Sequence, residues 1–252
     1  MKRIKYGSIV SAALILLLAA PFAVAQTGTA GSGHWEGTIQ LPKKAVKIVV
    51  DLAQDAKGEW TGSLEIPEQK LSLAVSDIAV NKPSVSFNSK EWLLAVEGEL
   101  SPDGKSIKGG FTSGFLLSVP VPMQLQWVSR AAVKGPAGST RISRDMEGTW
   151  EGVVTLGAAW EDDNTSAGST TTVRVTLVTG PGGIASGALS KPGAPDPVPL
   201  SVIGLKGNTF RLELNSAGVV YVGDLKDGQL IGEWNQFGLD PVPLTLKHIN
   251  SK

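Results

Sequence analysis

Cysteine is absent from the 252 residues of this chain, and histidine occurs only twice, as His34 and His248. Without thiols the chain has no disulfide, no thiol nucleophile and no cysteine-ligated metal. Small secreted domains usually depend on disulfides, whereas domains of about a hundred residues bury enough surface to be stable without them. The two histidines stand near opposite ends of the chain, which argues against a catalytic triad or a metal site that contains both. We expect each histidine to be an exposed residue at the end of a strand.

An excess of charge is also missing, because 23 Lys and Arg balance 23 Asp and Glu. This balance does not favour binding to nucleic acid. No Gly-x-Ser-x-Gly elbow of an α/β-hydrolase occurs in the chain. Glu36 and Glu151 stand at equivalent places beside tryptophans, but strand alternation directs them outward and away from a common cleft. We therefore predict no catalytic residue, no metal site and no cofactor, and we expect the protein not to be an enzyme.

Long apolar runs are scarce, and the longest extends from Ile9 to Ala20. It follows Lys2, Arg3 and Lys5 and precedes Ala23-Val24-Ala25, which is the pattern of a cleaved export signal. The run is short for a membrane span. We predict a signal peptide over residues 1–25, a disordered segment over 26–32, a periplasmic or extracellular location, and no membrane span after cleavage.

An internal repeat dominates the remaining sequence. Gly33-His34-Trp35-Glu36-Gly37 matches Gly148-Thr149-Trp150-Glu151-Gly152, and Pro120-Val121-Pro122 matches Pro241-Val242-Pro243. Between these two pairs, Asp103-Gly104 matches Asp227-Gly228. Three matches in the same order indicate a duplicated unit. We place the first unit at residues 33–128, a linker at 129–145 and the second unit at 146–249.

Apolar residues alternate with a period of two in both units, as half-buried strands require. Turn signals such as Pro102-Asp103-Gly104 separate the segments, and short connections favour an up-and-down meander. The predicted fold is all-β, with two tandem antiparallel meander barrels of roughly eight strands each. The expected strands of the first unit are Trp35–Leu41, Ile48–Leu52, Trp60–Ile66, Leu71–Val75, Val85–Phe87, Trp92–Leu100, Ile107–Phe111 and Val119–Trp127. Those of the second are Trp150–Leu156, Val173–Leu177, Val198–Val202, Phe210–Leu214, Val219–Leu225, Leu230–Trp234 and Val242–Leu246.

Paired prolines occur in the last strand of each unit, at Pro120 with Pro122 and at Pro241 with Pro243. Residues two apart direct their N–H groups to the same side, so each pair removes two donors from one strand edge. This predicts an open seam where the last strand would otherwise pair with the first. The similar segment 196–200 predicts a second weak edge in the second unit. Alternatively, the prolines only prevent edge-to-edge aggregation.

Several of these motifs resemble a known family. The Gly-x-Trp-x-Gly opening, the Gly58-Glu59-Trp60-Thr61-Gly62 strand, the Ser101-Pro102-Asp103-Gly104 turn and the terminal Pro243-Leu244-Thr245-Leu246-Lys247 are similar to the lipocalin-like or avidin-like β-domain of secreted bacterial proteins. That domain often precedes an α/β-hydrolase domain. The resemblance implies that this chain has two such barrel modules, duplicated and without the hydrolase domain. It implies no particular ligand, because no ligand-binding motif of the family is matched residue by residue.

Aromatic residues are the candidate ligand-binding residues. Trp160 lies on a polar insertion of the second unit, and the others fall on predicted inward faces, where core packing is the competing interpretation. The candidates are Trp35, Trp60, Trp92, Trp127, Trp150, Trp160, Tyr221 and Trp234. The sequence therefore predicts an exported, non-catalytic binding or accessory module that holds a small apolar ligand or docks an extracytoplasmic protein partner. The alternatives are a purely structural or interaction protein with filled barrels and, more distantly, a secreted hydrolase-associated enzyme.

Overall fold

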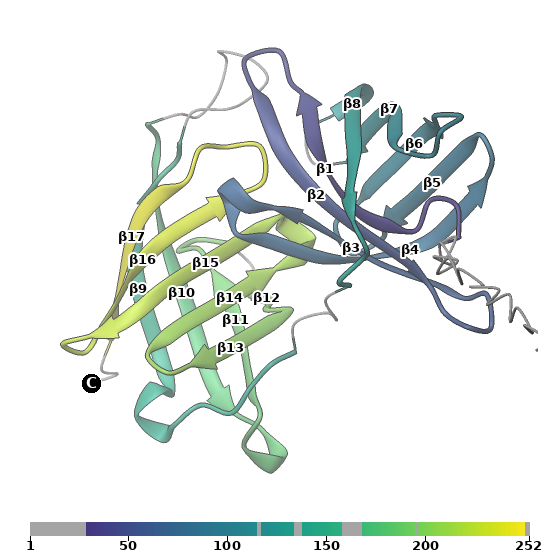
Figure 1. Ribbon diagram of the computed structural model, residues 1–252. Helices are drawn as coiled ribbons and strands as arrows, with labels where there is room; N and C mark the ends of the chain where they lie inside the picture. Colours follow the sequence, from purple (N-terminus) through teal and green to yellow (C-terminus); the bar gives the residue numbers. More distant parts are fainter. Residues whose placement is uncertain (1–28, 115–116, 134–137, 158–167, 195, 250–252) are drawn as a thin grey trace, which may run out of the picture.

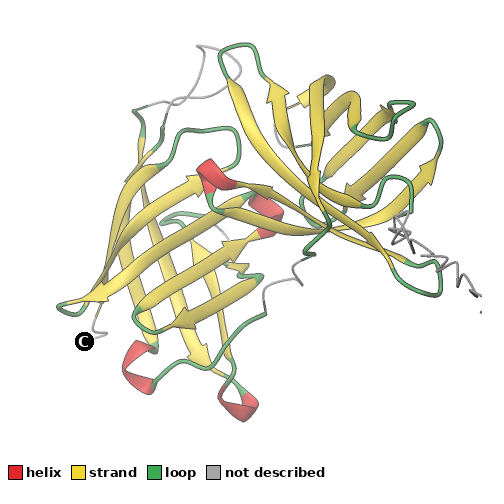
Figure 2. Cartoon of the chain, in the orientation of Figure 1, coloured by secondary structure: helices red, strands yellow, loops and turns green. Residues whose placement is uncertain are grey.

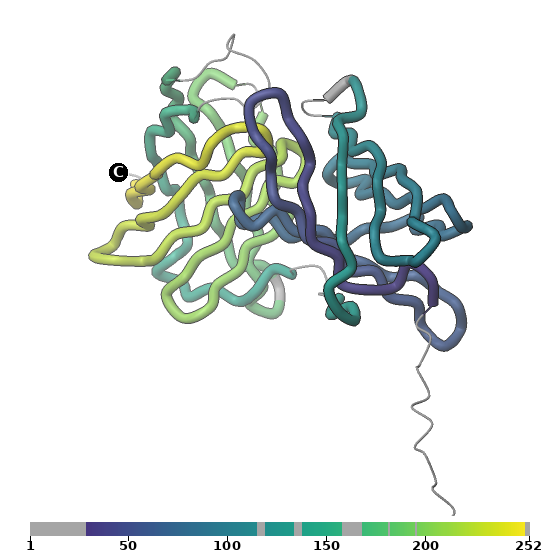
Figure 3. The backbone as a smooth tube through the Cα atoms, turned by 45° about the horizontal axis from the view of Figure 1, so that its top comes forward, coloured from purple at the N-terminus to yellow at the C-terminus, as the bar shows by residue number. Residues whose placement is uncertain are grey.

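The computed structural model describes residues 29–114, 117–133, 138–157, 168–194 and 196–249. The predicted signal peptide and Trp160 lie outside these ranges. The described residues form two antiparallel β-structures, which lie side by side in Figure 1 and Figure 3. Within the described ranges, no helix is both long and apolar enough to cross a membrane. The helices are single 3-10 turns, drawn red in Figure 2: η1 (Pro67–Gln69), η2 (Arg144–Met146), η3 (Pro181–Gly183) and η4 (Asn215–Ala217).

The first unit is a closed barrel in which each strand pairs with its neighbours in sequence and β8 pairs back with β1. Its eight strands are β1 (Gly33–Gln40), β2 (Ala45–Gln54), β3 (Trp60–Ile66), β4 (Leu71–Asn81), β5 (Ser84–Ser89), β6 (Leu94–Leu100), β7 (Ser106–Ser113) and β8 (Leu117–Ser129). The predicted meander is confirmed here, because alternation and short turns together leave consecutive pairing as the simplest solution.

The second unit is a nine-stranded curled sheet in the order β12-β11-β10-β9-β17-β16-β15-β14-β13. Its strands are β9 (Gly148–Thr155), β10 (Thr170–Thr179), β11 (Ala185–Ser190), β12 (Val198–Pro199), β13 (Val202–Lys206), β14 (Thr209–Leu214), β15 (Val219–Lys226), β16 (Gln229–Gln236) and β17 (Val242–Ile249). Sequence analysis did not predict β11, because its Ala, Ser and Gly residues show little apolar alternation. The single strand expected over 198–202 is broken into β12 and β13.

In both units the last strand pairs with the first. The predicted open seam at the paired prolines is therefore wrong. β8 pairs with β1 from Ser129 to Met123, and the ladder ends just before Pro122. In the second unit, β17 pairs with β9 only through Lys247–Ile249, well beyond Pro243. In the first unit the ladder therefore stops at the prolines, and in neither unit do the prolines prevent the last strand from pairing with the first. The opening of the second unit lies instead between β12 and β13, at the weak edge predicted from residues 196–200.

A short segment of the predicted linker crosses this opening. We call residues 139–142 the strap. The Thr140 N–H donates to the Ile203 carbonyl of β13 at 2.8 Å, and the Ala185 N–H of β11 donates to the Thr140 carbonyl at 2.9 Å. Two N–H groups on the edge of β13 donate to strap side chains, from Ile203 to Ser139 Oγ and from Leu205 to Thr140 Oγ1. The strap thus satisfies an edge that would otherwise be free to pair with another chain.

The duplicated motifs have the same structural role in both units. Trp35 Nε1 donates to the Gly31 carbonyl at 3.1 Å, and Trp150 Nε1 donates to the Met146 carbonyl at 3.0 Å. Glycine is required where strands come close: a Cβ at Gly37 would lie 1.8 Å from the Gln124 oxygen, and one at Gly152 would lie 2.4 Å from the Thr245 oxygen. The repeat is therefore a repeat of backbone geometry as well as of residues.

Three residues predicted to face inward are exposed: Val119 by 68%, Trp127 by 41% and Val198 by 41%. The pairing of β7 with β8 shifts register between Phe111 and Ser113, and Val119 lies in the resulting bulge of β8. Trp127 lies at the barrel end, next to the register shift of β1 at His34 and Trp35. Val198 lies on the two-residue edge strand β12.

Candidate functional site

The aromatic residues predicted to bind a ligand do not form a common site. Most are closely packed, with Trp35 and Trp92 in the first core and Trp150, Tyr221 and Trp234 in the second, each no more than 5% exposed. Trp60 packs half-buried against the first core. Trp127 is partly exposed at the barrel end, and Trp160 lies outside the described residues. Their placement makes packing the main role of most of these rings.

The interior of the second barrel is nearly filled. A cavity of about 10 Å³ lies among Tyr221, Trp234 and Leu200. A space of this size holds roughly one water molecule, far less than a small organic ligand requires. The sequence predicted an apolar ligand behind these rings, and this cavity, as the described residues form it, is much smaller than such a ligand.

The first barrel has one end covered by the second unit. In an up-and-down meander, alternate turns share one end, and here these turns include Lys44, η1 and Glu91. Phe237 follows β16, is 6% exposed and packs within the first core, with its ring centroid 6.2 Å from that of Phe111. Val220, on the outer face of β15, also belongs to the first core. The side of the second barrel thus closes the end of the first.

Polar contacts hold the two units together around this apolar contact. The fully buried Gln69 donates from Nε2 to the carbonyl oxygens of Gln236 and Leu239, at 2.7 and 2.8 Å. At the rim, Lys70 Nζ lies 2.6 Å from Glu233 Oε2. η1 of the first unit therefore binds the β16–β17 connection of the second.

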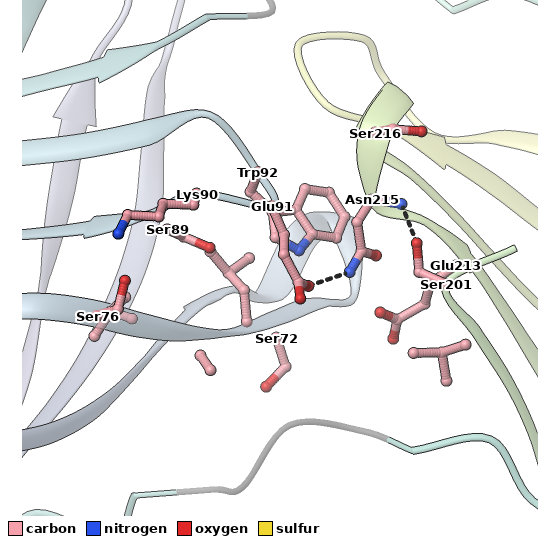
Figure 4. Close-up of a pocket in the computed structure, with 14 residues that line it drawn as sticks. Ser72, Ser76, Ser89, Lys90, Glu91, Trp92, Ser201, Glu213, Asn215 and Ser216 are labelled. Atoms are coloured by element: carbon pink, nitrogen blue, oxygen red, sulfur yellow. Dashed lines mark hydrogen bonds between the residues drawn. The ribbon is translucent and has the colours of Figure 1, made fainter. Parts of the chain in front are cut away.

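A groove of about 720 Å³ lies beside this contact, with walls from both units. One wall comprises the start of β4 and residues 89–92, and the other comprises the start of β13 with the end of β14 and η4. Figure 4 shows Glu91 and Trp92 on one side and Asn215, Ser216, Glu213 and Ser201 on the other. Of the predicted ligand-binding residues, Trp92 lines this groove.

Three polar side chains of the groove are largely buried: Ser89, Glu213 and Asn215. Asn215 Nδ2 donates to Glu91 Oε2 at 2.8 Å, across the two units, as the dashed line in Figure 4 marks. Arg211 Nε donates to Glu213 Oε1 at 2.5 Å. Among the described residues, the buried Asn215 Oδ1 atom has no hydrogen-bond partner. The groove therefore has carboxylate side chains from both units in its lining.

Sequence analysis did not identify Glu91, Glu213 or Asn215. They belong to different units and form no local motif, since 124 residues separate Asn215 from Glu91. They stand at strand ends, where the apolar alternation stops and polar residues are common, so the local sequence does not single them out. Only docking of the two barrels brings these side chains to one groove.

Both histidines are half-buried rather than exposed, contrary to expectation. His34 Nδ1 lies 3.0 Å from Asp51 Oδ1, and its Nε2 lies 3.5 Å from Glu36 Oε1. His248 Nε2 lies 2.8 Å from the Glu147 carbonyl, and its ring packs edge-on against Trp150. Glu36 and Glu151 form ion pairs with Lys47 and Arg174 on neighbouring strands. Within the described ranges, His, Asp and Glu form no cluster suited to a metal ion.

Comparison with known proteins gives little further information. No family model matches this chain, and no curated protein matches it. A crystal structure of a protein of unknown function from the DUF3598 family of Nostoc punctiforme is similar over 87% of this chain and 97% of its own, with 11% identity and a TM-score of 0.25. A similarity this weak carries no argument. The barrel fold agrees with the predicted resemblance to lipocalin-like domains, whereas membership and the link to hydrolases stay predictions.

Proposed function

We propose that this chain is an exported, non-catalytic binding module whose ligand site is the groove between its two barrels. The observation that carries the proposal is the contrast in available space: about 10 Å³ behind Tyr221 and Trp234, against about 720 Å³ in the groove. Small-molecule sites usually occupy about 300–1,000 Å³ and often lie between domains. In this proposal the barrels are packed scaffolds that hold the two walls of the groove in place.

The side chains of the groove support binding rather than catalysis. His34 and His248 are the chain's histidines, and neither lines the groove. The Glu91 and Glu213 carboxylates are held by Asn215 and Arg211, an arrangement that orders hydrogen-bonding groups for recognition. Export is supported by the basic and apolar pattern before Gln26. N-terminal sequencing of the native protein is expected to begin at Gln26, and an intact leader on the native protein would contradict export.

A ligand-observed NMR screen of chemically diverse small molecules tests the groove without assuming a ligand class. Ala74 is exposed and lines the groove, so Ala74→Trp should fill part of it without disturbing either core. The matched control is Thr38→Trp, at an exposed position of β1 that does not line the groove. Ligands that bind the wild type and the control but not Ala74→Trp support the proposal. A screen without such ligands refutes it.

A structural role is the second candidate function, favoured by the close packing of the second barrel. In that case the groove is only the space left where two curved surfaces meet. The same screen decides between the two functions, because a purely structural protein has no ligand whose binding depends on Ala74.

A further inference from the structure

The contact between the two units is made by side chains rather than by a shared sheet. Among the described residues, no strand of one unit pairs with a strand of the other. Phe237 and Val220 supply apolar surface to the contact, because both lie in the core of the first barrel although they belong to the second unit. The two units can therefore separate without the loss of any strand ladder.

Two amide side chains in this contact are buried without all of their hydrogen bonds. Gln69 donates two bonds to carbonyl oxygens of the second unit, but among the described residues its own Oε1 atom has no partner. Asn215 donates to Glu91 of the first unit, and its Oδ1 atom also has no partner among these residues. Closure of the contact thus takes two amide oxygens out of water without replacing their hydrogen bonds.

Asn235 adds a third buried amide, on the outer face of β16. It stands opposite Val220 of β15, and side chains directly opposite each other in an antiparallel pair lie on the same face. Because Val220 packs in the first core, Asn235 also faces the first unit. Asn235 is 1% exposed, and within the described ranges its Oδ1 atom has no partner. All three amide oxygens therefore lie where the units meet.

The free energies that favour and oppose this contact are close in size. An acceptor buried without a donor costs about as much as the burial of one large apolar side chain gains. The three amide oxygens therefore offset much of the gain from Phe237 and Val220. The ion pair of Lys70 with Glu233 adds little, because these side chains are 42% and 49% exposed. When the units separate, water satisfies all three amide oxygens.

We infer that the second unit is a lid that closes and opens over one end of the first barrel. In the closed state the two walls of the groove lie beside each other. In the open state the groove is lost, and the apolar end of the first barrel around Phe111 is exposed. A ligand that contacts both walls stabilises the closed state. The lid thus regulates the groove, and this role rests on the proposed function.

Single-molecule fluorescence energy transfer measures the opening of the lid without any ligand. The chain has no cysteine, so Lys57→Cys and Lys206→Cys give one exposed label position in each unit. We expect a main population that corresponds to the closed state. We also expect a second population with a different transfer efficiency, at about 1–10% of the molecules.

Two substitutions should change the ratio of open to closed molecules in opposite directions. Asn235→Leu replaces an unpaired buried amide by an apolar side chain of similar size, and should lower the ratio about tenfold. Phe237→Ala removes the ring that packs in the first core, and should raise the ratio at least about tenfold. Asn208→Leu, at an exposed turn residue, is the matched control and should leave the ratio unchanged. Circular dichroism confirms that each variant is folded.

The outcomes separate this inference from the proposed function. A single population in both the wild type and Phe237→Ala overturns the lid, and so does a ratio that Asn235→Leu raises or leaves unchanged. Neither result contradicts the proposed function, because a groove between two rigidly docked barrels can also bind a ligand. Conversely, if both populations are present but no molecule in the ligand screen depends on Ala74, the proposed function is wrong and the lid stands.

Discussion

The chain has two tyrosines, Tyr221 and Tyr6, and Tyr6 falls within the predicted signal peptide. The Tyr221 side chain is 2% exposed, and its hydroxyl donates to the Leu244 carbonyl at 3.4 Å. Burial, with a smaller contribution from Asp224, raises the pKa of this hydroxyl well above its ordinary value of 10.0. The phenol therefore reports directly on whether the core of the second barrel stays closed.

We predict that native Tyr221 forms no phenolate near pH 10. Because its folded pKa exceeds the unfolded one, its contribution to the free energy of unfolding is complete below about pH 10 and is lost as the pH rises further. Near-ultraviolet absorbance measures the phenolate, and circular dichroism monitors the fold. The control is the chain unfolded in guanidinium, which should titrate near pH 10. A native chain that titrates there with its β signal intact would contradict the buried placement.

At the scale of elements, the strap decides how the second barrel closes. Thr140 contributes its N–H, its carbonyl and its hydroxyl to β11 and β13. Thr140→Val retains the backbone bonds but leaves the Leu205 N–H without its acceptor, and should cost about 1 kcal/mol. We expect faster hydrogen exchange at Leu205 and Ile203, with little change elsewhere. Thr38→Val, at an exposed position of β1, serves as the control, and equal exchange in both variants would rule out the role of the strap.

At the scale of the whole molecule, Phe237 joins the two units. Phe237 follows β16 of the second barrel, but its ring packs in the core of the first barrel, against Phe111. Phe237→Ala should destabilise the first barrel by about 3–5 kcal/mol, because a large ring is removed from a buried contact. Leu93→Ala, at a residue 57% exposed, should have little effect.

Urea unfolding followed by tryptophan fluorescence measures this coupling. The wild type should unfold in a single transition. In Phe237→Ala, the unfolding midpoint of the first barrel should fall to a lower urea concentration than that of the second. Two separate transitions in the wild type, unchanged by Phe237→Ala, would show that the units are thermodynamically independent.

Local sequence pattern determined most of the fold. Alternation placed all eight strands of the first barrel, and the duplicated Gly-x-Trp-x-Gly marked the first strand of each unit, because close strand approach at Gly37 and Gly152 excludes a side chain. The prediction failed where pairing register shifts, as at Val119, and where a strand lacks apolar residues, as in β11. Such strands form because a neighbouring edge is available for pairing, and no local pattern encodes that edge.

Local pattern is thus enough to predict the class of fold, the internal repeat and the aromatic cores, since these depend on residues close together in the chain. The opening between β12 and β13, the strap that crosses it and the closure of the first barrel by Phe237 follow instead from long-range contacts. The groove also follows from such contacts, because Glu91 and Asn215 come from separate units. The physical reason is that docking depends on the shapes of two finished barrels, and these shapes exist only after the strands have paired.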